Sequence, residues 1–188
     1  LELADSLLKN TGYEEISLTS LSSSDYTCIE KLTLDLLRKT KEKRVNLALP
    51  SLRIDNFSKE LMDEIQSVRK SSLTFAPEAG TQRMRDVINK NIKEEDVLKT
   101  ARMAFEGGHS TIKLYFMIGL PTETLDDVAG IAELAEKVVS LYYEVSRERR
   151  LNRGKVTVSV SSFVPKPMTP FQWERQDSLT EIQEKQRY

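Results

Sequence analysis

Ile112-Lys113-Leu114-Tyr115-Phe116-Met117-Ile118 alternates between apolar residues and other residue types, which is the pattern of a β-strand with two unlike faces. Its aliphatic residues and Phe116 share one face, and Lys113, Tyr115 and Met117 share the other. Four more segments alternate in a similar way and are also predicted to be strands: Glu15–Leu21, Arg44–Pro50, Ser72–Ala76 and Lys155–Phe163. The chain is therefore expected to contain five strands, each apolar on one face and small or polar on the other.

Helical patterns separate these strands, because apolar residues recur there at spacings of three and four. The stripes lie within Ile29–Leu37, Leu61–Val68, Met84–Phe105 and Ile131–Val145. Alternating strands and helices predict an α/β fold with parallel strands and right-handed crossovers. An open doubly wound sheet would be apolar on both faces, and a complete eight-stranded barrel fills its lumen with branched side chains. The polar faces instead predict an incomplete, wider barrel with outer helices and a ligand in its lumen.

The 188 residues are 39% hydrophobic and 30% charged with a net charge of −1, which is typical of one globular domain. This balance gives no basic field for nucleic acid, and no apolar run is long enough to span a membrane. A cytoplasmic protein is the resulting expectation. Cys28 is the only cysteine, so one chain cannot form an internal disulfide or a multi-thiolate metal site. We predict that Cys28 packs as a small apolar residue and that no metal ligands are present.

Sites of parallel α/β barrels form at the carboxyl ends of the strands. Five segments follow the predicted strands and concentrate hydroxyls, turn-forming residues and isolated charges: Ser22–Asp25, Ser51–Asp55, Pro77–Thr81, Gly119–Glu123 and Val164–Pro170. Arg53, Glu78 and Lys90 are candidate cofactor contacts, with helix capping as the alternative role of the last two. Lys113 and Tyr115 are predicted to face the lumen as substrate contacts, since the opposite register would bury a lysine under the helices.

Three segments, in this order and spacing, resemble the later strands of a radical S-adenosylmethionine (SAM) domain: Leu73–Thr81, Lys113–Glu123 and Ser161–Trp173. The resemblance is strongest to an uncharacterised branch described as cobalamin-binding-type radical SAM or Fe–S oxidoreductase proteins, and the methylthiotransferases are more distant. It implies a partial TIM-like (β/α)6 barrel that holds about strands 2 to 6 with their outer helices. On this interpretation residues 1–188 are a single domain, the C-terminal portion of a barrel truncated at both ends.

The resemblance also implies which residues contact SAM. Ser22, Ser23 and Ser24 match the turn that holds the methionine amino group. Glu78 matches a contact to the ribose region, and Lys90 matches a basic residue that pairs with the SAM carboxylate. The implied positions near the adenine are Gly119 through Glu123 and the backbone of Phe163 and Val164. Tyr115 stands where many relatives have an aspartate, so the ribose contact made at that position is altered here.

The defining feature of the superfamily, a three-cysteine loop that binds a [4Fe–4S] cluster, has no counterpart in this sequence, because Cys28 is alone. The intact protein is expected to use SAM and the cluster to generate a 5′-deoxyadenosyl radical that abstracts hydrogen from an unidentified substrate. Whether it also uses cobalamin is open. The 188 residues alone are expected to hold no cofactor and to be inactive.

Two other functions remain open on sequence grounds: a methylthiotransferase-like enzyme that modifies tRNA or protein, and a non-catalytic barrel that binds a ligand. The discriminating observation is whether the upstream sequence of the gene encodes a Cys-x-x-x-Cys-x-x-Cys loop, because without it the radical mechanism would fail. A barrel without its first strand exposes unpaired backbone at one edge, so a homodimer that covers this edge is also expected.

Overall fold

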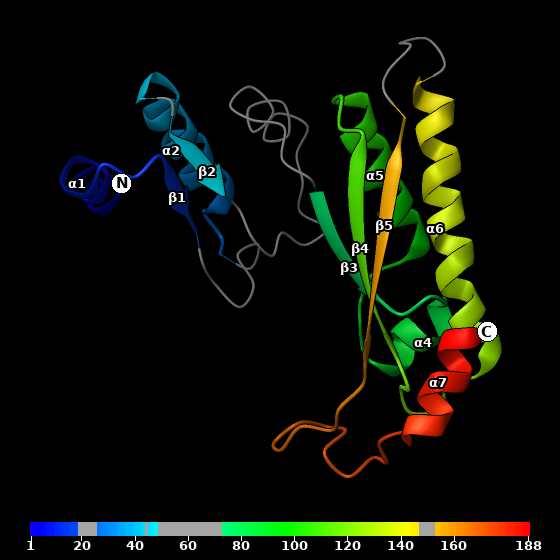
Figure 1. Cartoon of the computed structure of the whole chain (residues 1–188). Coiled ribbons are helices and arrows are strands. Elements are labelled where there is room, and N and C mark those ends of the chain that lie inside the picture. The colour runs from blue at the N-terminus through cyan, green and yellow to red at the C-terminus, as the bar shows by residue number, and fades with distance from the viewer. Residues whose placement is uncertain (19–25, 44, 49–72, 147–152) are drawn as a thin grey trace.

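The computed structural model describes residues 1–18, 26–43, 45–48, 73–146 and 153–188 (Figure 1). These ranges contain the strands β1 (Glu15–Ser17), β2 (Asn46–Ala48), β3 (Leu73–Glu78), β4 (Thr111–Ile118) and β5 (Lys155–Ser162). Their helices are α1 (Glu2–Thr11), α2 (Ile29–Lys43), α4 (Gln82–Val87), α5 (Glu94–Glu106), α6 (Leu125–Ser146) and α7 (Leu179–Arg187). All five predicted strands are therefore present, whereas the helix predicted within Leu61–Val68 falls outside the described residues.

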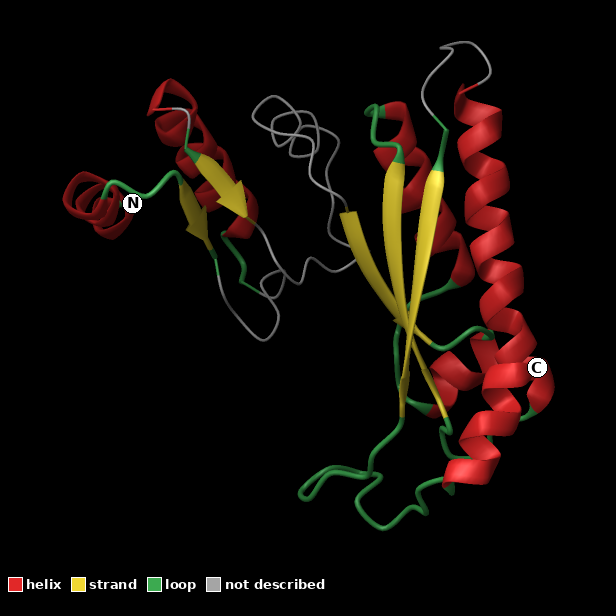
Figure 2. Ribbon diagram, viewed as in Figure 1, coloured by secondary structure: helices red, strands yellow, loops and turns green. Residues whose placement is uncertain are grey.

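The strands form two sheets, and the pairings within both are parallel (Figure 2). β1 pairs with β2, and the other sheet has the order β3-β4-β5. In sequence, α2 separates β1 from β2, α4 and α5 separate β3 from β4, and α6 separates β4 from β5. Parallel neighbours need such crossover helices, so the predicted α/β architecture is confirmed. None of the described helices combines the length and the apolar composition needed to cross a membrane.

β4 has the two unlike faces that its sequence predicts. Ile112, Leu114 and Phe116 are fully buried, whereas Tyr115 is exposed and Lys113 is half-buried. The buried face packs against α5 and α6, which lie on one side of the sheet (Figure 1). These two helices contribute Val97, Ala101, Ala104, Phe105, Leu134, Val138 and Tyr142 to the core. The polar side chains of β4 therefore point away from the helices.

β5 departs from the prediction of a packed apolar face. Val156 packs against the core, but Val158 is 38% exposed and Val160 is 46% exposed. The register places these two valines beside Leu114 and Phe116, on the helix-covered face. β5 is the edge strand of the described sheet, so its outer half has fewer neighbours than β4. The alternating pattern predicted the face of Val158 and Val160 correctly. It did not predict their exposure, which depends on whether a helix or loop packs over them.

Cys28 is exposed in the turn before α2, so the prediction that it packs as a small apolar residue is wrong. The apolar stripe of α2 begins after it, and the buried members of this stripe, Leu36 and Leu37, pack with Leu47 of β2. Cys28 directly precedes α2 in the sequence, but its side chain does not join the packed face of this helix. The short β1-β2 unit thus has a small core of its own.

The loop after β3 packs directly against α6 through two glycines. A Cβ atom on Gly80 would lie 2.3 Å from the backbone nitrogen of Ile131 and 2.5 Å from the carbonyl carbon of Gly130. A Cβ atom on Gly130 would lie 2.7 Å from the methyl group of Thr81. Only glycine permits backbones to approach so closely. This contact fixes the carboxyl end of β3 relative to α6.

Candidate functional site

The carboxyl ends of β3, β4 and β5 lie at one end of their parallel sheet, where the sites of α/β barrels form. Three connections begin at this edge: the loop from Ala79 to Thr81, the loop from Gly119 to Thr124, and the segment that starts at Phe163. Five predicted site residues fall on these connections or just before them: Glu78, Gly119, Glu123, Phe163 and Val164. Lys113 and Tyr115 lie within β4, and Lys90 follows α4. Four of the predicted cofactor contacts, Ser22, Ser23, Ser24 and Arg53, lie outside the described residues.

Glu78 and Lys90 form an ion pair at the end of β3, with Lys90 Nζ 3.3 Å from Glu78 Oε1. The two side chains are 28% and 31% exposed, so solvent and small molecules can reach both. Glu78 has a φ of +68°, in the left-handed region that disfavours residues with side chains. The pairing of β3 with β4 also shifts register between Phe75 and Glu78. Since backbone strain gathers at functional sites, this pair is the leading candidate for a ligand contact.

Arg85 of α4 supports the loop after β3 from within the protein. Its guanidinium is fully buried, and Nη1 donates to the carbonyl oxygens of Ala79 (2.9 Å) and Gly80 (3.1 Å). Nη2 donates to the side chain of Gln82 at 3.2 Å. Burial lowers the pKa of Arg85 from its ordinary value, because desolvation disfavours the charged form. Sequence reasoning missed this residue, and a short helix with two arginines offers no signal that one of them is buried.

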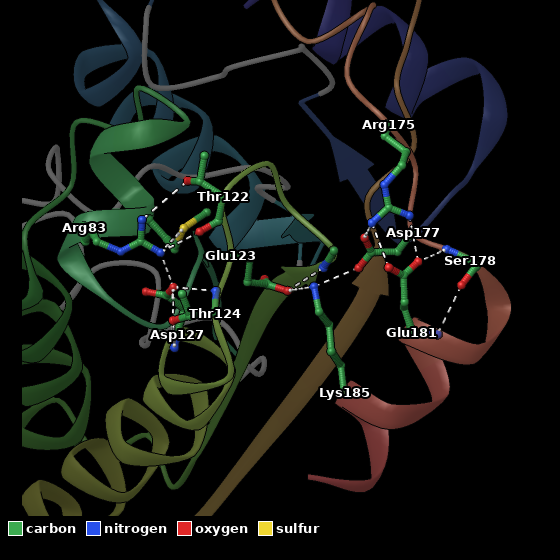
Figure 3. Close-up of polar contacts among 12 residues, drawn as sticks. Arg83, Thr122, Glu123, Thr124, Asp127, Arg175, Asp177, Ser178, Glu181 and Lys185 are labelled. Carbon is green, nitrogen blue, oxygen red and sulfur yellow. Dashed lines mark hydrogen bonds and ion pairs between the residues drawn. The ribbon is translucent and has the colours of Figure 1, made fainter.

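Asp127, at the start of α6, connects the loop that follows β3 with the loop that follows β4. Its contacts with Arg83 and Thr124 are shown in Figure 3. Its carboxylate accepts hydrogen bonds from the Thr81 hydroxyl (2.5 Å) and from the backbone N–H (2.8 Å) and hydroxyl (2.7 Å) of Thr124. Arg83 donates to it as well and also donates to the carbonyl oxygen of Thr122 at 2.9 Å. Burial alone would raise the pKa of Asp127, but the hydrogen bonds from Arg83, Thr81 and Thr124 outweigh it and hold this pKa below its usual range.

Glu123, predicted near the adenine, is directed into the protein. Its Oε2 accepts hydrogen bonds from the backbone N–H of Gly119 and from Lys185 Nζ of α7, both at 2.7 Å. Lys185 also donates to Asp177 Oδ2 at 2.7 Å (Figure 3). We call Glu123, Asp177 and Lys185 the C-terminal clamp. Only 3% of the Glu123 side chain and 14% of the Lys185 side chain are exposed, so the clamp is nearly closed to solvent.

The clamp explains why glycine follows β4. Gly119 has a φ of +80°, and a Cβ atom there would lie 3.1 Å from both the Asp177 carboxylate and the Ile182 side chain. Burial alone would lower the pKa of Lys185, but its hydrogen bonds to Asp177 and Glu123 outweigh burial and raise this pKa. Lys185 therefore stays charged and holds the turn after β4 against α7. The partners Glu123 and Lys185 lie 62 residues apart, so local sequence patterns could not reveal the pair.

Lys185→Met is expected to lower the free energy of unfolding by about 2 kcal/mol, because it leaves two shielded carboxylates without their cation. Urea unfolding followed by circular dichroism measures the difference. The matched control is Lys166→Met at an exposed lysine, with an expected change within about 0.5 kcal/mol. Equal effects of the two substitutions would show that the clamp adds nothing to stability.

Phe163 and Val164 continue β5 beyond the sheet. Phe163 is buried, its N–H donates to the carbonyl oxygen of Ile118 at 2.8 Å, and its ring packs edge-on against Phe171 with centroids 6.0 Å apart. Val164 is half exposed. Because Ile118 takes the N–H of Phe163, an adenine contact here would have to use the other backbone groups of these two residues.

The chain is similar to known proteins in both sequence and fold. The model of the radical SAM superfamily matches residues 1–135. The chain is 34% identical over 175 residues to the uncharacterized protein MJ0966 of Methanocaldococcus jannaschii, an alignment that covers 93% of this chain and 35% of that protein. The chain therefore spans about a third of the length of this relative.

Among solved structures, the fold is similar to that of coproporphyrinogen III oxidase (HemN) from Escherichia coli, which is described as a radical SAM enzyme. The TM-score is 0.54 at 15% sequence identity, over 82% of this chain and 32% of that one. At this identity the likeness shows a common fold, which agrees with the predicted α/β barrel architecture. Because the family model covers well over half of its residues, the chain belongs to the radical SAM superfamily.

Proposed function

We propose that the intact protein is a radical SAM enzyme that cleaves SAM to methionine and a 5′-deoxyadenosyl radical, which abstracts hydrogen from a substrate still to be identified. The observation that carries the proposal is the Glu78–Lys90 pair at the carboxyl end of β3. Superfamily membership supplies the chemistry, and this pair supplies two opposite charges at the edge of the sheet where ligands of such barrels bind.

The two side chains suit the polar groups of SAM. Lys90 has three N–H donors and gives one to Glu78, so it can also donate to the carboxylate of the methionine moiety. Glu78 can accept hydrogen bonds from the ribose hydroxyls. Arg85 fixes the loop that follows Glu78, and Asp127 ties this loop to α6 through Thr81. The pair is therefore positioned by buried contacts while remaining accessible itself.

An iron–sulfur cluster does not fit these residues. A [4Fe–4S] cluster requires several thiolates, and the sequence has Cys28 alone. In the described part of the chain no group of three or more histidine, cysteine, aspartate or glutamate side chains could hold a metal ion. The proposal therefore assigns cluster binding to other residues of the intact protein and expects these 188 residues to be inactive by themselves.

The test compares the intact wild-type protein with Lys90→Met after anaerobic cluster reconstitution. Equilibrium dialysis with labelled SAM is expected to show at least about tenfold weaker binding by the variant, since one charge-assisted hydrogen bond is lost. Reduction of the wild-type protein with dithionite is expected to release methionine and 5′-deoxyadenosine, which chromatography detects.

The matched control is Lys99→Met, at an exposed lysine of α5, which should bind SAM as the wild type does. Wild-type affinity in Lys90→Met would remove the Glu78–Lys90 pair from the SAM site. Failure of the reduced wild-type protein to cleave SAM would refute the proposed function and leave a ligand-binding barrel as the explanation.

A further inference from the structure

The polar face of the β3-β4-β5 sheet carries two lysines, Lys113 of β4 and Lys155 of β5, among hydroxyl groups. The register aligns Lys113 with Thr74 on one side and with Thr157 on the other. Tyr115, two residues along β4, is aligned with Ser159. A strand alternates its faces, so these side chains share the side of the sheet that points away from α5 and α6. A positive charge here is surrounded by groups that donate hydrogen bonds.

Lys113 is held in place rather than extended into solvent. Its Nζ lies 2.7 Å from the hydroxyl oxygen of Tyr115 and 4.5 Å from the centroid of the same ring. The lysine is half-buried, although it stands on an open strand face. Contacts of an ammonium with an aromatic face are weak at exposed sites, so they orient the group without neutralising it.

No carboxylate among the described residues forms an ion pair with Lys113. Other lysines in the described ranges do have such partners: Lys39, Lys43, Lys90, Lys137 and Lys185. The one acidic residue of the three described strands is Glu78, which is aligned with Phe116 rather than with Lys113 or Tyr115 and pairs with Lys90 at the edge. Between Thr74 and that edge, the face offers positive charge and hydroxyls without a counter-charge from these strands.

Building on the proposed function, we propose that Lys113 and Tyr115 bind an anionic group of the substrate, a carboxylate or a phosphate. The ammonium supplies the charge, and the tyrosine hydroxyl and the aligned threonines supply further donors. Glu78 is aligned with Phe116, three residues along β4 from Lys113. At about 3.3 Å per residue, the anionic group lies about 10 Å from the Glu78–Lys90 pair along the strand. The substrate class is therefore an elongated anionic molecule that enters the barrel with its charged end first.

Acetylation of lysines in the intact protein, followed by peptide mass spectrometry, tests the inference without knowledge of the substrate. The probes are inorganic phosphate and glutarate, which represent the two possible anionic groups. Each probe that fits is expected to slow acetylation of Lys113 at least threefold, with saturation, and to leave the exposed Lys99 unaffected in the same sample. Protection by one probe alone identifies the anionic group. If neither phosphate nor glutarate changes the rate of Lys113 acetylation, the inference is overturned, whatever that rate is.

Two substitutions separate this site from the SAM site. In Tyr115→Phe, which retains the ring, the protection of Lys113 is expected to weaken. Lys113→Met is expected to keep wild-type SAM affinity, because the Glu78–Lys90 pair lies elsewhere on the sheet. Loss of SAM binding in Lys113→Met would make Lys113 part of the SAM site and overturn the inference. If the wild-type protein binds no SAM but Lys113 is still protected by an anion, the proposed function fails while the anion site stands.

Discussion

Gly80→Ala is expected to lower the free energy of unfolding by at least about 3 kcal/mol, the upper end of the range for overpacking. The new Cβ atom would lie 2.3 Å from the Ile131 nitrogen, 2.5 Å from the Gly130 carbonyl carbon and 2.8 Å from the Asp127 carbonyl oxygen. All three are backbone atoms of α6, so no side-chain rotation can relieve the overlap. Either α6 or the loop after β3 must move, and the thermal unfolding transition followed by circular dichroism will show the loss.

Gly12→Ala is the matched control. Gly12 has a φ of +69°, but nothing lies within 4 Å of the position that a Cβ atom would take, so alanine there brings backbone strain without a clash. The expected loss is about 1 kcal/mol. If Gly80→Ala were no more destabilising than Gly12→Ala, close approach of α6 to the loop would not be the reason for glycine at position 80.

Asp127→Ala is expected to lower the free energy of unfolding by about 3 kcal/mol at neutral pH, because several hydrogen-bond donors lose their charged acceptor. The donors are the Thr81 hydroxyl, both donor groups of Thr124 and the Arg83 guanidinium. The Arg83 side chain is half exposed and can turn to water, so it contributes little to the loss. Urea unfolding at neutral pH measures the change.

The same carboxylate predicts a pH dependence. The pKa of Asp127 is lower in the folded protein than in the unfolded chain, so its contribution to stability is present above the unfolded value of about 4 and is lost as pH falls toward the folded value. Asp127→Asn removes this titration and keeps the shape. The difference in stability between wild type and Asp127→Asn is therefore expected to shrink steadily as pH falls below about 4. A constant difference across that range would mean that the charge of Asp127 does not contribute.

The features that sequence predicted well depend on neighbours along the chain. Alternation in β4 gave both of its faces, because side-chain direction in a strand is a local property. The parallel direction of β3, β4 and β5 could be predicted because helices separate these strands in the sequence. Glu78 and Lys90 were predicted as two separate positions, and the structure is what brings the two charges together.

The features that sequence could not predict depend on which distant segment covers a residue. Val158 and Val160 lie on the expected face, yet they are exposed because the described sheet ends at β5. Arg85 has the composition of a surface helix residue, and burial comes from the loop that folds over it. Lys185 reaches Glu123 from the far end of the described chain, a pairing that no periodicity encodes.

Because of the C-terminal clamp, the backbone amide of Gly119 reports on whether α7 is docked. The N–H of Gly119 donates to Glu123, whose carboxylate is held in turn by Lys185 of α7. Hydrogen exchange at this amide therefore requires release of the α7 contact and not only fraying of β4. Undocking of α7 would be a small, separately opening unit of the fold. The rigidity of the turn that follows β4 is thus set partly by α7. A molecule that binds α7 would therefore change the rate of hydrogen exchange at the Gly119 amide.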